Sequence, residues 1–245
     1  AKLVYTLIML AMIGLVIFAG NKGAEESQGF RDMGELAAIV TGLYALIFAL
    51  VAYGGFSRGG AIFSLSDVNL IFTSPAKQER VLFYGLFQQL GNALMLGLFI
   101  VFQYGWMRNV YGVRYGAVLL MLAGYAAAVF LGQFTAMVIY SFTSSDERRK
   151  KLVKTLFFAV IAAFALYAAS ALPGGPGALT RLVAAVNGEV LSLFPVGGWL
   201  GRAVYGIMTG DVRNILIGLG ISAVYLICLI ALIVKGHPDF YEDVL

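Results

Sequence analysis

The sequence predicts an all-α, polytopic membrane protein that crosses the bilayer as six transmembrane helices. Of 245 residues, 60% are hydrophobic and 12% are charged, whereas soluble domains carry roughly 25% charged residues. The apolar residues form six blocks of 17 to 28 residues with almost no charge, and a helix of ~20 residues crosses the ~30 Å hydrocarbon layer. The blocks lack the alternating polarity of a membrane β-barrel strand, so helices are the remaining way to satisfy the backbone in lipid.

The six blocks are expected to belong to one transmembrane domain that covers the chain. The predicted spans are residues 3–19, 36–56, 81–104, 115–142, 152–172 and 212–234. The first block has the length of a signal peptide, but no small-x-small cleavage site precedes Asn21, which favours a retained span. Because the chain begins with Ala1 and ends on a charged tail, we expect it to be part of a longer protein.

The segment between the second and third spans, residues 57–80, is too polar to cross a membrane. Ser66 or Asp67 can cap a short helix, and Ser74 followed by Pro75 is typical of a helix start, because proline lacks the N–H that would be unpaired there. We therefore expect a short interfacial helix in this segment.

Residues 173–211, between the fifth and sixth spans, hold two stretches that are too short to span. An amphipathic stretch at 178–193 and a second stretch at 199–208 flank a break at Phe194–Gly198. Non-helical backbone is tolerated at membrane depth only where protein or water satisfies it. The pattern predicts a broken hairpin that dips into the interface or into the protein.

Basic residues predict the orientation of the spans. With a cytoplasmic first terminus, ten Lys and Arg residues fall inside and seven outside, and the short loop around residues 148–154 contributes five of the ten. Both termini are therefore expected in the cytoplasm, at the inner membrane, and the broken hairpin is expected on the extracytoplasmic side.

The sequence shows none of the common catalytic or nucleotide-binding motifs. Its single histidine, His237, follows the last span, whereas membrane metalloproteases and Ser-His hydrolases need a histidine at membrane depth. Cys228, the one cysteine, cannot form an intrachain disulfide. We expect no catalytic residues, no metal site and no cofactor bound by this chain.

The span interiors offer amides and hydroxyls but almost no charge. Gln88, Gln89 and Asn92 fall within about one helical turn, so they are the candidates for lining a pathway. For other polar residues we prefer interhelical hydrogen bonding: Gln103, Gln133, Thr135, Ser170 and Ser222. Glycine pairs four residues apart are expected to allow close helix packing: Gly112 and Gly116, Gly197 and Gly201, Gly206 and Gly210.

Three sequence runs resemble a known family. Asp67 to Pro75 reads DVNLIFTSP and is followed by RVLFYGL, the hairpin break reads FPVGGWL, and the chain closes with FYED near its end. These runs and the order of the spans are similar to those of a bacterial family of ABC exporters, with the layout of a type-two exporter permease. The resemblance covers most of the chain, and its motifs are structural.

The resemblance implies a transmembrane subunit that pairs with a second permease half, identical or different, and with separate cytoplasmic ATPase subunits that bind Mg-ATP. It also implies that the segment between spans two and three couples to the ATPase, through Asp67, Asn69, Phe72 and Pro75. The substrate stays open, and no nucleic-acid partner is expected. Two alternatives are a membrane structural or assembly factor that transports nothing, and a membrane enzyme, which the lack of an acid/base pair disfavours.

Overall fold

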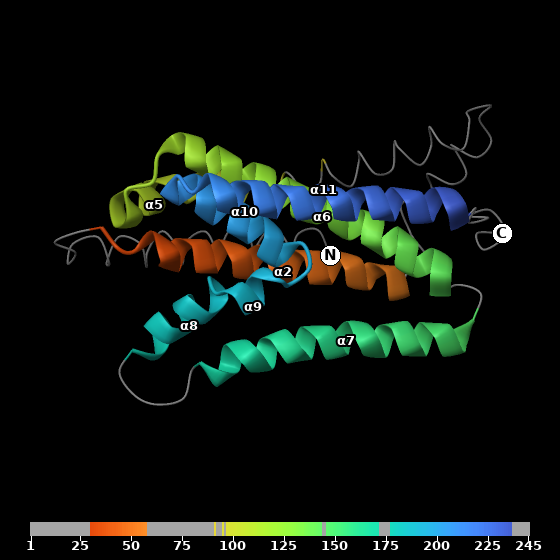
Figure 1. Ribbon diagram of the computed structural model, residues 1–245. Helices are drawn as coiled ribbons and strands as arrows, with labels where there is room; N and C mark the ends of the chain where they lie inside the picture. Colours follow the sequence, from red (N-terminus) through yellow and green to blue (C-terminus); the bar gives the residue numbers. More distant parts are fainter. Residues whose placement is uncertain are drawn as a thin grey trace, which may run out of the picture.

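The structure is a computed structural model that describes residues 30–57, 91, 95, 97–143, 146–171 and 177–236. Every named element in these ranges is a helix (Figure 1). The helices are α2 (Met33–Ser57), α5 (Tyr104–Tyr111), α6 (Tyr115–Thr143), α7 (Glu147–Ser170), α8 (Ala178–Val186), α9 (Glu189–Ser192), α10 (Gly197–Thr209) and α11 (Val212–Gly236).

Four of these helices are long and apolar enough to cross a membrane: α2, α6, α7 and α11. They coincide with the predicted spans 36–56, 115–142, 152–172 and 212–234. The chain is therefore a multi-pass, all-helical membrane protein. The predicted span 3–19 lies outside the described residues, as does most of the span 81–104.

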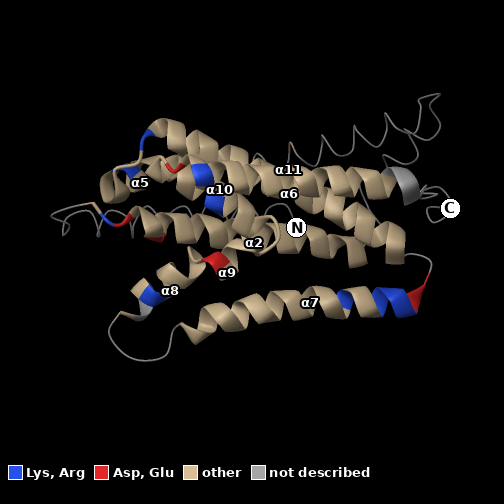
Figure 2. Ribbon diagram, in the orientation of Figure 1, with Lys and Arg blue, Asp and Glu red and all other residues tan. Residues whose placement is uncertain are grey.

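The described helices define two ends of the bundle. α2, α6 and α11 run in one direction and α7 runs in the other (Figure 1). The basic end holds the junction of α6 and α7, where Lys and Arg gather on the first turns of α7 (Figure 2). The hairpin end holds the start of α2, the α5 helix and the corner between α10 and α11.

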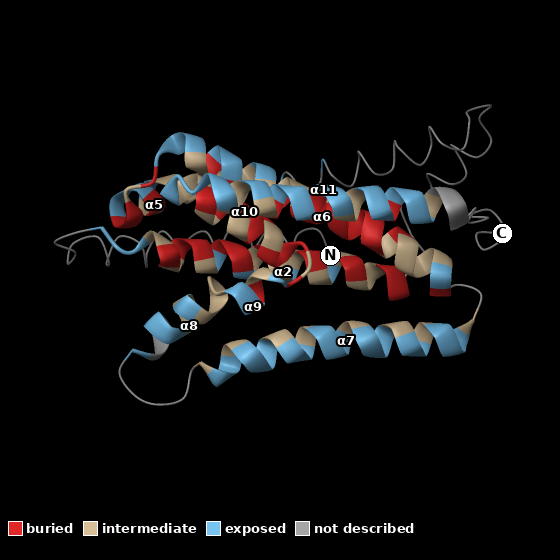
Figure 3. Cartoon of the chain, in the orientation of Figure 1, coloured by how far each residue is buried: buried red, intermediate tan, exposed pale blue. Residues whose placement is uncertain are grey.

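The core lies between α2 and α6, which pack in parallel. Tyr44 on α2 and Met121 on α6 are fully buried, and Figure 3 shows the buried faces of both helices turned toward the centre of the bundle. Glycines bring the backbones together: a Cβ at Gly132 would lie 3.0 Å from Val51 Cβ, and one at Gly55 would meet the Ala136 backbone. The two residues of each pair are 81 positions apart in the sequence, so both contacts fit a single register of two parallel helices.

α7 contacts the bundle along one side, largely through aromatic residues. Its described residues include none that are buried (Figure 3). Phe158 contacts Tyr53 with ring centroids 5.7 Å apart, and Phe164 contacts Phe194 at 5.1 Å. Lys154 lies 5.5 Å from the centre of the Tyr53 ring, an arrangement that favours a cation.

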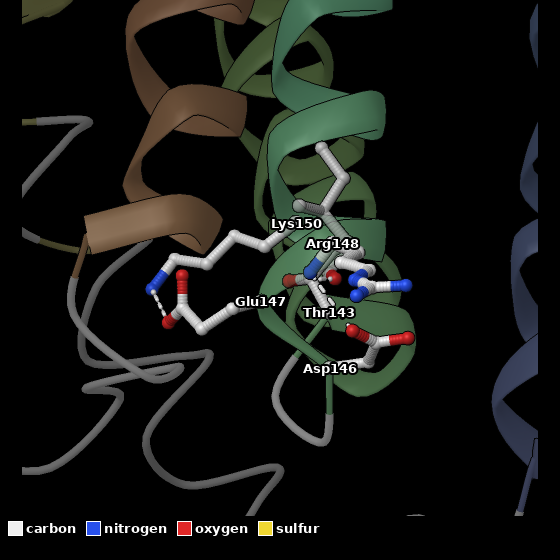
Figure 4. Close-up of polar contacts among 6 residues, drawn as sticks. Thr143, Asp146, Glu147, Arg148 and Lys150 are labelled. Atoms are coloured by element: carbon white, nitrogen blue, oxygen red, sulfur yellow. Dashed lines mark hydrogen bonds and ion pairs between the residues drawn. The ribbon is translucent and has the colours of Figure 1, made fainter.

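α7 begins at Glu147, five residues before the predicted span at 152, because its charged first turn is capped. Asp146 accepts a hydrogen bond from the N–H of Arg148 at 2.8 Å, and Lys150 donates to Glu147 at 3.4 Å (Figure 4). A carboxylate at a helix N-terminus satisfies an otherwise unpaired N–H and complements the helix dipole. The basic run is therefore helical rather than a loop.

The link at 105–114, between the predicted spans 81–104 and 115–142, is mostly the helix α5. This helix ends at Gly112, whose φ of +70° is a left-handed C-cap. Two aromatic rings contact each other there: Trp106 lies 5.3 Å from Tyr111, centroid to centroid. A Phe30 ring lies close to Gly112 and packs the start of α2 against this cap.

Candidate functional site

The broken hairpin is the described region that departs most from a plain helical bundle. The break predicted at Phe194–Gly198 is present, since α9 ends at Ser192 and α10 begins at Gly197. The amphipathic stretch 178–193 is itself divided at Asn187 and Gly188 into α8 and α9. The hairpin is thus three helices that pack on the longer helices, and none of the three is among those long enough to cross a membrane.

Asn187, at the first division, ties the hairpin to α2. Its side-chain amide donates a hydrogen bond to the Gly34 carbonyl at 2.8 Å, across 153 residues of sequence. Gly34 lies in the first turn of α2, where the Asp32 side chain accepts from the Gly34 N–H at 3.0 Å. A substituent on Gly34 would approach both side chains, so the glycine leaves room for this three-way contact.

The second division is a tight turn centred on Val196. Its φ of 59° and ψ of −57°, with the Gly197 N–H donating to Pro195 O at 2.6 Å, describe a γ-turn of the strained, positive-φ type. A β-branched residue in that region costs of order 1–3 kcal/mol. Val196 is fully buried, so packing around its side chain holds the turn in place.

Two glycines dock α10 on α2. A Cβ at Gly197 would meet the backbone of Ala45, and a Cβ at Gly201 would meet the side chain of Thr41. The two contacts pair positions four apart on each helix, in antiparallel order. The close packing predicted for Gly197 and Gly201 is therefore confirmed. Gly206 also packs closely, against Ile215 and the Asp211 carbonyl.

The remaining glycines of the predicted pairs have other roles. Gly112 and Gly210 are left-handed helix caps, and a Cβ on Gly116 would meet nothing within 4 Å. Four-residue spacing alone therefore does not separate packing glycines from capping glycines.

A polar cavity of about 70 Å³ lies where the hairpin meets α2 and α11. Its lining is mostly polar or small and comes from five helices and the α8–α9 division: Thr41, Val186, Asn187, Glu189, Ser192, Gly198, Gly201, Arg202, Tyr205 and Asn214. A basic and an acidic side chain are both among them. This composition differs from the apolar surfaces of the rest of the bundle.

A chain of hydrogen bonds holds Arg202 in place. Arg202 Nε donates to Asn214 Oδ1 at 2.7 Å, and Asn214 Nδ2 donates to Asp211 Oδ2 at 2.7 Å. The other carboxylate oxygen of Asp211 accepts from the N–H of Arg213 at 3.0 Å, which caps α11. The orientation of the guanidinium is thus fixed from the first turn of α11.

Arg31, Glu35 and Tyr111 form a second polar contact at the hairpin end. Arg31 lies 3.9 Å from Glu35, and the Tyr111 hydroxyl donates to Glu35 at 3.5 Å. Burial and the nearby charge of Glu35 raise the pKa of the Tyr111 hydroxyl. The Arg31 N–H also donates to the Val110 carbonyl at 2.8 Å, so this contact joins α2 to the end of α5.

The three hydroxyl residues predicted to bond between helices have two different outcomes. Thr135 Oγ1 donates to Leu131 O at 2.7 Å and lies 2.9 Å from the Tyr225 hydroxyl. Since the threonine hydrogen is used, Tyr225 is the donor, and this α6–α11 bond confirms the prediction for Thr135. Ser170 and Ser222 instead bond carbonyls of their own helices.

Gln133, in the interior of α6, differs from Thr135, Ser170 and Ser222 because its side-chain oxygen is unpaired in the described structure. Its side chain is buried, and its Oε1 has no hydrogen-bond partner in the described structure. An unpaired buried carbonyl of this kind costs ~1–3 kcal/mol. This makes Gln133 the one described span residue with an unused polar atom in the core.

The residues predicted to couple to an ATPase and to line a pathway lie outside the described residues. They are Asp67, Asn69, Phe72, Pro75, Gln88, Gln89 and Asn92. Conversely, the sequence reasoning missed the Asn187 tie and the Arg202, Asn214 and Asp211 chain. The available signals were Asp211 directly before an apolar block, as a helix cap, and an arginine within the otherwise uncharged run GWLGRAVYG.

Within the described ranges, no group of three or more His, Cys, Asp or Glu residues could hold a metal ion.

Comparison with known proteins gives a family match over the whole chain. The family described as "Putative ABC exporter" matches residues 1–245. No curated protein and no solved structure matches the chain.

Proposed function

Because the chain belongs to the ABC exporter family and is a multi-pass membrane protein, we propose that it is the transmembrane permease subunit of an ATP-driven exporter. ATP is hydrolysed on separate cytoplasmic subunits, and this chain provides the route across the membrane. The family match implies association with ATPase components, and the proposal assigns the permease role to this chain.

The broken hairpin is the observation that supports a permease most strongly. It is fastened at one end of the bundle to α2 through Asn187 and Gly201, and to α11 through Arg202. A structural element that holds two spans together at one end, and is too short to cross the membrane itself, is suited to closing a route between those spans. A helix bundle that served only as an anchor has no need of such an element.

The coupling role is assigned to the segment between the second and third spans. On the family resemblance, Asp67, Asn69, Phe72 and Pro75 form a short helix that docks on the ATPase. Mg-ATP is bound by that partner, and no catalytic residue is assigned to this chain. A second permease half, identical or different, completes the transporter.

Orientation follows from the distribution of charge. The first turns of α7 carry Arg148, Arg149, Lys150 and Lys151, and basic residues favour the cytoplasmic side. The basic end is therefore assigned to the cytoplasm, where the ATPase binds, and the hairpin end to the outside of the inner membrane. This arrangement puts the ATPase and the hairpin at opposite ends of the same spans.

The pathway is assigned to amide side chains. Gln88, Gln89 and Asn92 are the candidates from the sequence, and the unpaired Oε1 of Gln133 supports a polar group on the α6 side. A buried amide oxygen that lacks a partner among the described residues can accept a hydrogen bond from a molecule in transit.

The test is recovery of an ATPase with the full-length protein from native membranes. We expect ATPase subunits to copurify with the unaltered protein. Combined replacement of Asp67, Asn69 and Phe72 by alanine should reduce their recovery at least tenfold, while Asn109→Ala, an exposed polar change on α5 at the other end, should leave it unchanged.

If no ATPase accompanies the unaltered protein, the permease proposal fails. If an ATPase copurifies but its hydrolysis rate in proteoliposomes is unaffected by the triple replacement, the assigned coupling segment is wrong. Retained ATPase binding without any ATP-dependent transport phenotype would favour the assembly-factor alternative.

A further inference from the structure

The Arg202 guanidinium is held in one orientation, but only part of its hydrogen-bonding capacity is satisfied in the described structure. Its side chain makes one hydrogen bond within the described structure, through Nε to Asn214. Arg202 lines the cavity, and its two terminal nitrogens, which carry four N–H groups, have no acceptor among the described residues. A guanidinium held in one orientation binds a carboxylate or phosphate with two parallel hydrogen bonds. This corner of the cavity is therefore suited to an oxyanion.

Glu189 gives the same cavity an acidic side. It begins α9 and is exposed at the cavity rim, and it forms no ion pair with Arg202 in the described structure. A simple anion would be attracted by Arg202 and repelled by Glu189. A ligand with an oxyanion and an ammonium group satisfies both side chains.

The hydroxyl and amide groups between these charges add neutral contacts. Thr41, Tyr205 and Asn187 line the cavity, and each carries at least one group that can donate or accept. Because Asn187 already donates to Gly34, its amide is held in position. The polar groups thus converge on one space from α2, α10 and the α8–α9 division.

The size of the cavity limits the ligand to a small group. A space of ~10–15 Å³ holds one water, so the cavity of about 70 Å³ has room for several waters or for a group such as a phosphate with a short amine. A large hydrophobic molecule does not fit, but its polar head does.

The cavity begins at the hairpin end of the spans and extends inward from it. Asn214 is in the first turn of α11, and Thr41 is eight residues into α2, a depth of roughly 12 Å at 1.5 Å per residue. The headgroup region begins at the ends of such spans. A ligand can therefore enter the cavity from the interface with only its head inside the protein.

We propose that the hairpin cavity is a binding site for a zwitterionic group, with an oxyanion held by Arg202 and an ammonium held by Glu189. The same chemistry is present in a phosphoethanolamine lipid headgroup and in free phosphoethanolamine. The proposal concerns binding by this chain alone and does not depend on association with an ATPase.

The experiment measures binding to the purified full chain in detergent, without ATPase. The probes are short-chain phosphatidylethanolamine, short-chain phosphatidylglycerol, which has the phosphate but no amine, and free phosphoethanolamine. We expect phosphatidylethanolamine to bind at least tenfold more tightly than phosphatidylglycerol. Binding of free phosphoethanolamine as well would identify the soluble group as sufficient, and binding of the lipid alone would identify a lipid headgroup as the ligand.

Three variants assign the contacts. Arg202→Gln should weaken phosphatidylethanolamine binding roughly tenfold to hundredfold, since it removes charge-assisted hydrogen bonds. Arg213→Gln is the matched control, because Arg213 is an exposed arginine of the same corner that does not line the cavity. Glu189→Gln should reverse the preference, because it should weaken binding of phosphatidylethanolamine and strengthen binding of phosphatidylglycerol.

The proposal is overturned if the two lipids bind equally to the unaltered protein, or if Arg202→Gln and Arg213→Gln have the same effect. Arg202 is bonded to Asn214, so its loss could also disturb folding. Glu189→Gln, at the exposed rim, avoids this problem, and failure to change the lipid preference in that variant alone is sufficient to reject the site.

Discussion

Tyr44 donates a hydrogen bond through its hydroxyl to the carbonyl oxygen of Met121, 2.5 Å away, across the buried interface of α2 and α6. The same hydroxyl lies against Gly124, where a Cβ would be 2.9 Å from Tyr44 Cζ. One side chain therefore both links the two spans and requires a glycine opposite.

We predict that Tyr44→Phe lowers the free energy of unfolding by about 0.5–1 kcal/mol, a usual value for one interhelical hydrogen bond in a membrane. Gly124→Ala should cost about 1–3 kcal/mol through overpacking. The double variant should lose less unfolding free energy than the sum of the two single losses, because removal of the hydroxyl leaves room for the methyl group. SDS titration in mixed micelles measures all three, and strict additivity would contradict the proposed contact.

The γ-turn predicts an unusual order of stability at Val196. Val196→Ala and Val196→Gly both remove buried side-chain atoms, but glycine adopts positive φ freely, whereas alanine there costs about 1–2 kcal/mol. We expect the glycine variant to be about 1 kcal/mol more stable than the alanine variant.

Val204, buried within α10, is the control for that comparison. In a helix interior, glycine is less stable than alanine by about 1 kcal/mol, so the order should be reversed. Thermal unfolding of the alanine and glycine variants at Val196 and at Val204 measures both orders of stability. The same order at both positions would rule out the strained turn.

Gly197→Ala should weaken attachment of the hairpin, since the new methyl group would meet the Ala45 backbone, which cannot move aside. We expect a loss of about 1–3 kcal/mol and faster proteolysis within α8 to α10. Gly116→Ala, in open space at the start of α6, should be neutral or slightly stabilising because alanine favours helix. Equal effects at both glycines would argue against the packed interface.

The topology is testable with single cysteines in a Cys228→Ser background, since Cys228 is the one native cysteine. We expect an impermeant thiol reagent added to intact cells to label Thr209→Cys, at the hairpin end, and to leave Arg149→Cys unlabelled. Permeabilised cells provide the control, in which both positions should react. The opposite labelling pattern would show that the chain is inverted.

Gln133→Leu should separate stability from transport. Removal of the unpaired Oε1 should leave stability unchanged or raise it by about 1 kcal/mol, while ATP-dependent export falls if the amide meets the substrate. Thr135→Val, two residues away, should instead lower stability by about 0.6 kcal/mol through loss of the bond to Tyr225. Unchanged export by Gln133→Leu would remove this residue from the proposed pathway.

The spans were predictable because lipid imposes one strong rule on them. Apolar length and the absence of charge placed α2 and α11 within three residues of their observed ends, and the Pro-Gly break of the hairpin was equally clear. The start of α7 lies five residues before the predicted span, because the charged block is not a loop but a helical turn capped by Asp146.

The polar site was much less predictable from the sequence. Asn187 bonds Gly34 across 153 residues, and Arg202 depends on Asn214 in the next helix. Both contacts join different structural elements, so no periodic pattern in the local sequence indicates them. Of the expected interhelical hydroxyls, only the Thr135 contact formed as predicted among the described cases, because serine in a helix readily bonds its own preceding turn.

The distant contacts of α2 also affect the order in which the protein is made. The face of α2 that carries Thr41 and Ala45 receives α10, which follows it by about 150 residues in the sequence. At a synthesis rate of ~5–20 residues per second, the ribosome needs roughly 8 to 30 s to supply that partner. During this interval α2 is inserted with its final contact surface uncovered, so a chaperone or lipid that shields this face would act at that stage of biogenesis.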